Sequence, residues 1–295
     1  MLFGVGMALL ASLGWAGSSI ILKFLTTKVD TVTINTLRLW TGTSVLLIFV
    51  LVSGRYTAIF DFQVTSLAYV VTSGILAMAI GDTVYIRSLS MLDASIAFPI
   101  AQCAFVLFSG FAAVMWLDEP YTWITVIGAV LIVAGIYLIA TGGRTRPVDL
   151  HSLSLTGVSV TLIAAAFWTA SAIALRIGSE GLDAFVVAAI RISVSAVVLT
   201  LLTLLRSKAR AIRLRQYAAS TLLLGATAGL LTYGVAGVAF VFAIQTIGAG
   251  KSVLLTSTAP LFALPFAIIF LKERPTRWTI AGVVISILGV YFVVN

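Results

Sequence analysis

Charged residues are scarce in this chain. Asp, Glu, Lys and Arg together make up only 9% of its 295 residues, whereas 61% of the residues are hydrophobic. An average soluble domain carries roughly 25% charged residues, so the charges present are too few to cover a water-soluble surface. The composition excludes a soluble enzyme and a disordered regulator, and it predicts an integral membrane protein.

Cysteine and histidine are scarcer still. The single cysteine, Cys103, excludes an internal disulfide and a cysteine-based metal site. It lies in an apolar run, where a free thiol packs like a small hydrophobic residue. The single histidine, His151, lies in a polar stretch near mid-chain. We therefore exclude a secreted disulfide scaffold, and we expect no metal and no cofactor.

Long apolar runs follow one another along the chain. A helix of about 20 apolar residues crosses a bilayer core about 30 Å thick. The runs are continuously apolar and lack the alternation of strands, which favours helices over a barrel. The sequence therefore predicts an all-α integral membrane fold with ten transmembrane helices. Their expected ranges are 2–25, 32–53, 64–89, 92–117, 121–141, 153–176, 184–206, 217–246, 249–271 and 276–294.

The two halves of the chain repeat each other at rare residue types. Each half holds an odd number of predicted helices, five, so the second half starts on the opposite side of the membrane. The halves are therefore predicted to be inverted repeats, which in many transporters place a binding site near the midplane. The pairs are Trp15/Trp168, Lys23/Arg176, Asp30/Asp183 and Arg38/Arg191 at an offset of 153, and Glu119/Glu273, Gly128/Gly282, Gly135/Gly289 and Tyr137/Tyr291 at an offset of 154.

The polar stretch 142–147, rich in turn residues, separates the halves. We predict a first repeat over 1–141, a cytoplasmic linker over 142–152 and a second repeat over 153–295. Of the 18 Lys and Arg residues, 13 fall in loops on the face of the linker, which the positive-inside rule makes cytoplasmic. This placement explains the net charge of +8 better than nucleic-acid binding does. Both termini are then expected on the periplasmic side of a plasma (inner) membrane.

Several motifs have a familiar pattern. Residues 81–89 read Gly-Asp-Thr-Val-Tyr-Ile-Arg-Ser-Leu, and an Ala-Ser pair at 94–95 leads to Pro99. Glu119 precedes glycines at 128 and 135, and the same frame returns at Glu273. With these motifs the whole chain resembles the EamA-family carriers of the drug/metabolite transporter superfamily, and it is similar to the YddG-like aromatic amino-acid exporters. The resemblance implies a duplicated ten-helix carrier of small metabolites.

One feature departs from the small multidrug carriers of the same superfamily. Those four-helix proteins use a glutamate in their first helix to exchange protons for cationic drugs, whereas residues 1–25 of this chain contain no acidic residue. Proton-coupled efflux of cations by that mechanism is therefore not expected here.

Asp82 is the acidic residue deepest within a predicted membrane helix. Ionisable residues inside the bilayer are costly and mark a pathway or a buried pair. Asp82 is thus a candidate substrate contact or coupling site, with a structural ion pair to Arg38 or Arg87 as the alternative. Tyr85 lies three residues on, on a similar helix face, and offers a ring and a hydroxyl to a translocation cavity.

Trp15 and Trp168 lie well inside their helices, although tryptophan usually marks the membrane interface. They are candidates for the wall of a cavity that stacks apolar or aromatic side chains, with ordinary helix packing as the alternative. The other candidate wall residues are Phe98 and Gln102 in the fourth helix, and Tyr233, Phe240 and Gln245 in the eighth.

Basic residues offer further candidates. Lys251 follows glycines at the predicted start of the ninth helix, where free N–H groups and the helix dipole favour a carboxylate; an exposed loop lysine is the alternative. Arg38 and Arg191 are expected to snorkel to the interface or cap loops, each within its own half. Substrate binding is the alternative for both arginines.

Prolines and glycines shape the predicted helices. Pro99, Pro260 and Pro265 free backbone carbonyls and are candidate hinges, with static kinks as the alternative. Paired glycines seven residues apart lie on one face of 121–141 and of 276–294. We predict that these two helices pack closely there, with glycines tolerated in lipid-facing helices as the alternative.

The leading interpretation is a secondary transporter that exports small amphipathic metabolites, foremost aromatic or neutral amino acids, by alternating access. Its partners are a small-molecule substrate and the lipid bilayer, without nucleic acid, and the internal duplication permits a monomer. The alternatives are a multidrug carrier and a sugar-phosphate or nucleotide-sugar carrier. An intramembrane enzyme is disfavoured because Asp82 stands alone and His151 lies in the linker. ATP-driven pumping is disfavoured because the sequence contains no phosphate-binding loop. A receptor is a further alternative, and it would carry no solute across the membrane.

Overall fold

The computed structural model describes residues 1–25, 28–88, 91–92, 94–141, 154–206, 217–271 and 276–294. Every regular element among these residues is a helix. Eight of the described helices are long and apolar enough to cross a membrane, and the apolar helix Trp123–Ile139 is shorter. The predicted all-α membrane fold is thereby confirmed in its class.

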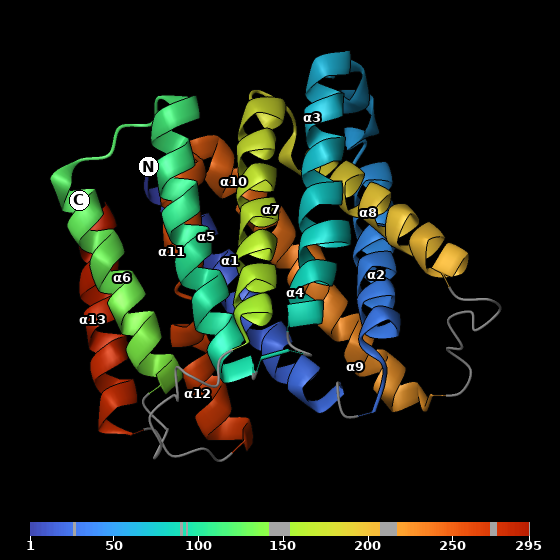
Figure 1. Ribbon diagram of the computed structural model, residues 1–295. Helices are drawn as coiled ribbons and strands as arrows, with labels where there is room; N and C mark the ends of the chain where they lie inside the picture. The colour runs from blue at the N-terminus through green and yellow to red at the C-terminus, as the bar shows by residue number, and fades with distance from the viewer. Residues whose placement is uncertain are drawn as a thin grey trace.

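The helices run side by side as a bundle (Figure 1). Both termini lie at one end of the bundle, and α6 ends and α7 begins at the other end (Figure 1). The elements in chain order are α1 (Leu2–Leu25), α2 (Thr31–Val52), η1 (Arg55–Asp61), α3 (Val64–Gly74), η2 (Ile75–Gly81), α4 (Asp82–Ser88), α5 (Ala94–Leu117), α6 (Trp123–Thr141), α7 (Leu155–Ser179), α8 (Ala184–Arg206), α9 (Ala219–Gly229), η5 (Leu230–Ala236), α10 (Gly237–Ile247), α11 (Ala249–Thr256), α12 (Ala259–Leu271) and α13 (Arg277–Val294).

Two π-helical segments occupy equivalent places in the two halves. Each contains seven residues, η2 between α3 and α4, and η5 between α9 and α10. π-Helical turns are rare and often lie at functional sites. A Cβ on Gly74, just before η2, would lie 2.5 Å from the carbonyl oxygen of Arg191, and one on Gly229, just before η5, would lie 2.6 Å from that of Arg38. The glycines therefore let each π-helical region pack closely on the helix that carries an arginine.

The helices α6 and α13 lie against each other at one side of the bundle (Figure 1). A Cβ on Gly128 would lie 2.7 Å from the carbonyl oxygen of Gly289, and one on Gly135 would lie 2.6 Å from that of Gly282. The lower-numbered glycine of α6 thus meets the higher-numbered glycine of α13, as in an antiparallel pair. The predicted glycine contact between these helices is confirmed.

The expected ninth helix, 249–271, is divided into α11 and α12. Pro260 has no N–H to donate to the carbonyl of Thr256, four residues earlier. Ser12 of α1 supplies a substitute: its hydroxyl lies 3.1 Å from the carbonyl oxygens of both Leu255 and Thr256. A break in a membrane helix needs such partners, because no water is available there.

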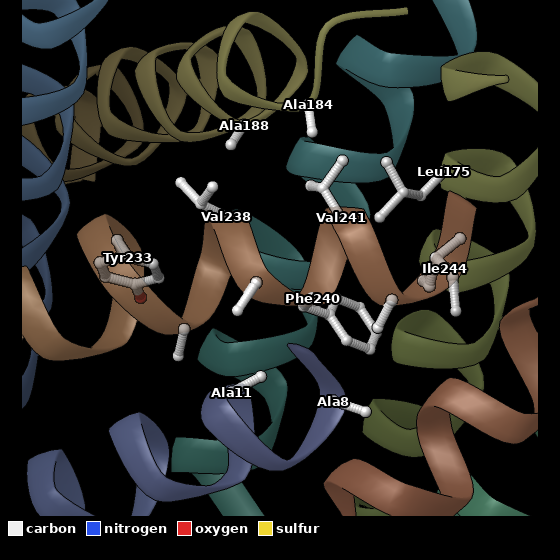
Figure 2. Packing of buried hydrophobic residues seen from close by; sticks show 14 of the residues in the cluster. Ala8, Ala11, Leu175, Ala184, Ala188, Tyr233, Val238, Phe240, Val241 and Ile244 are labelled. Atoms are coloured by element: carbon white, nitrogen blue, oxygen red, sulfur yellow. The ribbon is translucent and has the colours of Figure 1, made fainter. Parts of the chain in front are cut away.

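The core centres on α10, which lies between α1, α7 and α8 (Figure 2). Val241 and Ile244 are completely buried, and Leu175 of α7 faces them. Ala188 of α8 and Ala11 of α1 bring the neighbouring helices close from two sides, because small residues let backbones approach. This packing holds the middle of the second half firmly beside the first.

Some predicted features lie outside the described residues. These are the linker 142–152 with His151, the basic loop residues Lys208, Arg210, Arg213 and Arg215, and Glu273; the side chains of Phe98, Pro99 and Arg206 also lie outside the description.

Candidate functional site

Asp82 begins α4 directly after η2. Its Oδ1 atom accepts a hydrogen bond from the indole Nε1 of Trp168 at 3.0 Å, and its Oδ2 atom lies 3.5 Å from the hydroxyl oxygen of Tyr233. A carboxylate of the first half thus contacts two aromatic residues of the second. Among the described residues Asp82 forms no ion pair, so the alternative of a pair with Arg38 or Arg87 is not found.

A chain of hydrogen bonds continues from Tyr233 toward α2 and α1. The Tyr233 hydroxyl donates to Oδ1 of Asn35 at 3.0 Å, and Nη1 of Arg38 lies 3.4 Å from the same oxygen. Nη2 of Arg38 donates to Oγ1 of Thr232 at 2.8 Å, and Thr232 donates to Oγ of Ser18 at 2.6 Å. The network therefore links residues of the two halves.

An aromatic cluster borders the Asp82 carboxylate. The ring of Trp168 lies 5.3 Å from that of Tyr85 and 5.8 Å from that of Phe105, measured between centroids. Phe105 comes from α5, three residues after Gln102, and both side chains are half-buried. A carboxylate beside aromatic faces suits an organic ammonium group, which is attracted by the negative charge and by the ring quadrupoles.

The two arginines related by the repeat lie inside the bundle. Arg191 is 2% exposed; its Nε donates to Oγ of Ser73 at 2.8 Å, and its Nη2 lies 3.4 Å from Oγ of Ser171. Snorkelling is therefore wrong for Arg191, and for Arg38, which bonds to Thr232. Each arginine also reaches across to the other half of the sequence, so the expectation that each serves its own half is wrong.

Trp15 and Phe240 form a second aromatic pair, with ring centroids 5.3 Å apart. Phe240 is buried in the core around α10 (Figure 2). The described ring contacts and hydrogen bonds join these two residues to each other and not to Asp82. Of the predicted wall residues, the structure thus gathers Asp82, Tyr85, Trp168 and Tyr233, whereas Trp15 and Phe240 pack between α1 and α10.

Gln245 has a structural partner that the sequence did not reveal. Its Nε2 donates to the carbonyl oxygens of Ser179 at 2.6 Å and of Leu182 at 3.0 Å. The carbonyls at the end of a helix lack intrahelical partners, so this amide caps the end of α7 and ties it to α10. Its donor group is therefore used within the protein.

The N-terminus of α11 is occupied by a carboxylate of the protein itself. Oε1 of Glu119 accepts a hydrogen bond from the amide of Ala249 at 2.6 Å, and Oε2 accepts one from the amide of Gly250 at 2.9 Å. The expectation that this helix end holds a substrate carboxylate is corrected. Lys251 and Arg176 instead line, with Glu119, a pocket of about 350 Å³. Its other wall residues are Met1, Pro120, Thr246, Ile247 and Gly248.

The predicted hinge residues have different settings. Pro260 is the second residue of α12, directly after the break, and Pro265 lies inside that helix. The break separates α11, which ends at Thr256, from α12, which begins at Ala259. Phe98 and Pro99 belong to α5, and their side chains lie outside the described residues.

Several residues of the site escaped sequence analysis. Asn35 and Phe105 carried a usable signal, because each lies three residues from a polar candidate, Arg38 and Gln102 respectively, and so shares its helix face. The sequence offered no signal for Thr232, because its position depends on the π-helical turn of η5. Glu119 was seen as a family motif, but its contact with α11 joins residues 130 positions apart.

Apolar helices that enclose a charged and aromatic network define a multi-pass membrane protein with an internal polar site, and the comparisons with known proteins identify its class as a membrane transporter. The EamA-like transporter family matches residues 2–141 and again 155–295. The chain belongs to this family, which confirms the resemblance seen in the motifs and indicates a transporter rather than an enzyme.

Relatives and a solved structure agree with this assignment. An uncharacterized transporter of Archaeoglobus fulgidus is 27% identical over 234 residues, which cover 79% of this chain and 77% of that protein. The uncharacterized transporter YoaV of Bacillus subtilis is 27% identical over 140 residues, 46% of this chain and 44% of its own. One crystal structure superimposes with a TM-score of 0.81 at 17% identity, covering 98% of this chain and 95% of that one. That likeness shows the fold.

Proposed function

We propose that this chain is a secondary transporter that exports small amphipathic metabolites, foremost amino acids with aromatic or neutral side chains. The contact of Asp82 with Trp168 and Tyr233 carries the proposal, because it sets a carboxylate among aromatic rings within membrane-spanning helices. Ionisable groups at such depth are costly and usually serve a pathway. Asp82 receives the ammonium group of the substrate, and the rings of Trp168 and Tyr85 receive its side chain.

Alternating access between two inverted five-helix repeats, 1–141 and 153–295, is the mechanism that we propose. It is supported by contacts that cross between the halves, from Asp82 to Trp168 and from Arg38 to Thr232. Rocking of one half against the other would separate and re-form these contacts, exposing the site to one side at a time. The break before Pro260 serves as one hinge of this motion.

The proposed location is a plasma (inner) membrane. The linker 142–152 lies on the cytoplasmic side and both termini lie on the periplasmic side. The bias of Lys and Arg toward loops on the linker face supports this orientation. The pocket lined by Met1, Arg176 and Lys251 then opens toward the periplasm.

A multidrug carrier is the second candidate, favoured by one observation. Asp82 beside Tyr85 and Trp168 is also a suitable site for an organic cation without a carboxylate. A sugar-phosphate or nucleotide-sugar carrier has weaker support, because the three basic residues available to it, Arg38, Arg191 and Lys251, share no contact partner among the described residues.

Flux into liposomes that contain only the purified protein tests the proposal. Labelled tryptophan, phenylalanine, methionine and threonine, together with one cationic dye, are offered with and without a pH gradient. Saturable amino-acid flux is expected, and its response to the gradient shows whether protons are coupled. Flux of the dye alone would transfer the protein to the multidrug class, and absence of amino-acid flux would contradict the proposed substrate.

A further inference from the structure

The geometry points to Arg38 as the residue that binds the carboxylate of a zwitterionic substrate whose ammonium group binds Asp82. This inference rests on the function proposed above and names the side chain that selects amino acids over amines. The start of α11 beside Lys251, where the sequence predicted a substrate carboxylate, is filled by Glu119. Arg38 offers a positive charge within the bundle instead.

Arg38 has unused hydrogen-bonding capacity. A guanidinium group carries five N–H donors. Nη2 makes a short bond to Thr232 at 2.8 Å, Nη1 makes a long one to Asn35 at 3.4 Å, and the buried Nε has no partner among the described residues. An unpartnered buried donor is unfavourable, so an arriving carboxylate gains bonds that the protein alone does not provide.

Asp82 has unused acceptor capacity of the matching kind. A carboxylate offers about four acceptor sites, yet Asp82 has one bond of ordinary length, from Trp168. The hydroxyl of Tyr233 has a single hydrogen, which it donates to Asn35 at 3.0 Å, while Oδ2 of Asp82 lies farther away at 3.5 Å. An ammonium group with three donors would satisfy Oδ2.

Both charged groups lie beside Tyr233. The guanidinium carbon of Arg38 is 5.2 Å from the centre of the Tyr233 ring, and the hydroxyl oxygen of that ring is 3.5 Å from Oδ2 of Asp82. An α-amino acid carries an ammonium group and a carboxylate group on the same carbon. It therefore matches the pair of Asp82 and Arg38 while its side chain reaches the cluster of Trp168 and Tyr85.

The described residues of the second half contain no such pair at the equivalent positions. Asp82 is the residue that follows η2, and the residue that follows η5 is Gly237. Arg191, the counterpart of Arg38, is completely enclosed, and its described bonds go to the hydroxyls of Ser73 and Ser171. The duplicated arrangement therefore provides one zwitterion site, and an arginine held by hydroxyls alone in the other half.

Three indole compounds test the assignment in proteoliposomes. Tryptophan carries both charged groups, tryptamine lacks the carboxylate, and indole-3-propionate lacks the ammonium. Arg38→Gln is expected to lower tryptophan flux relative to tryptamine flux by about tenfold or more, the effect of one charge-assisted hydrogen bond. Arg38→Lys should retain part of the preference. Asp82→Asn should lower tryptophan and tryptamine flux together, and Arg277→Gln, at an exposed position at the start of α13, should change neither.

Each other outcome has a definite meaning. If the wild type carries tryptophan and Arg38→Gln leaves the tryptophan-to-tryptamine flux ratio unchanged, the role of Arg38 is overturned but the proposed function is not. Wild-type protein that carries none of the probes overturns the proposed substrate class and this assignment with it. If Arg38→Gln does not reconstitute, competition with labelled tryptophan flux in the wild type tests the assignment instead. Tryptamine or indole-3-propionate that competes as strongly as unlabelled tryptophan contradicts a two-charge site. Weaker competition by both compounds supports it.

Discussion

The carboxylate of Glu119 accepts a hydrogen bond from the backbone amide of Gly250, 131 residues further along the chain, at 2.9 Å. The same side chain lies so close to Gly248 that a Cβ there would be 2.5 Å from its carboxyl carbon, and Gly248 has a φ of +85°, which favours glycine. Glu119 thus fastens the segment between α5 and α6 to the start of α11. This contact joins the two halves at the end of the bundle where the termini lie (Figure 1).

Replacing Glu119 by glutamine should weaken this junction. One carboxylate oxygen would become an NH₂ group that faces a backbone N–H, so the free energy of unfolding should fall by about 2 kcal/mol. The melting temperature in detergent measures the loss. Glu180→Gln is the matched control, because its side chain is 76% exposed and 3.9 Å from Arg176. Equal melting temperatures for both variants would contradict a stabilising role of Glu119.

Removing the hydroxyl of Tyr121 should leave the protein as stable as before or slightly more stable. This hydroxyl is buried and has no hydrogen-bond partner in the part of the chain that the structure describes, so Tyr121→Phe deletes an unsatisfied polar group and should gain up to about 1 kcal/mol. Tyr233→Phe should lower stability, because the Tyr233 hydroxyl donates to Asn35 at 3.0 Å. Thermal unfolding of the two variants compares them, and a larger loss for Tyr121→Phe would show that its hydroxyl has a partner.

Enlarging a glycine between α6 and α13 should separate these helices. Gly135→Leu places a side chain where even a Cβ would lie 2.6 Å from the carbonyl oxygen of Gly282. Overpacking of this kind costs about 1–3 kcal/mol or more, so the melting temperature and the yield of folded protein should fall. Gly6→Leu is the control, because nothing lies within 4 Å of a Cβ at Gly6. The prediction fails if the two variants melt alike.

Trp168→Phe should reduce transport while preserving the aromatic cluster. Phenylalanine retains a ring beside Tyr85 and Phe105 but has no N–H for Oδ1 of Asp82, so the orientation of the carboxylate is lost. We expect tryptophan flux to fall about tenfold, the effect of one hydrogen bond to a charged group. Trp278→Phe, at a side chain that is 53% exposed, should not change flux. Undiminished flux through Trp168→Phe would remove this bond from the mechanism.

Sequence patterns predicted those features that depend on residue type and local spacing. Apolar length and scarce charge indicated membrane helices, and the motif around Asp82 and Tyr85 indicated the family. Glycines at seven-residue spacing indicated the contact of α6 with α13, because a helix places such residues on one face. The division of α11 from α12 was missed, although Pro260 suggested a bend, because Ser12 from a distant helix supplies the bonds that allow a break.

The sequence by itself thus determined a membrane-embedded helical transporter of a known family, because hydrophobicity and duplicated motifs are properties of residue order. The tertiary structure decided which groups meet. Arg38 and Arg191 are equivalent in the repeat, but Arg38 lies beside Tyr233 and near Asp82, whereas Arg191 is held by Ser73. The sequence could not show this difference, because the partners are distant in the chain and are brought together by π-helical turns and close glycine packing.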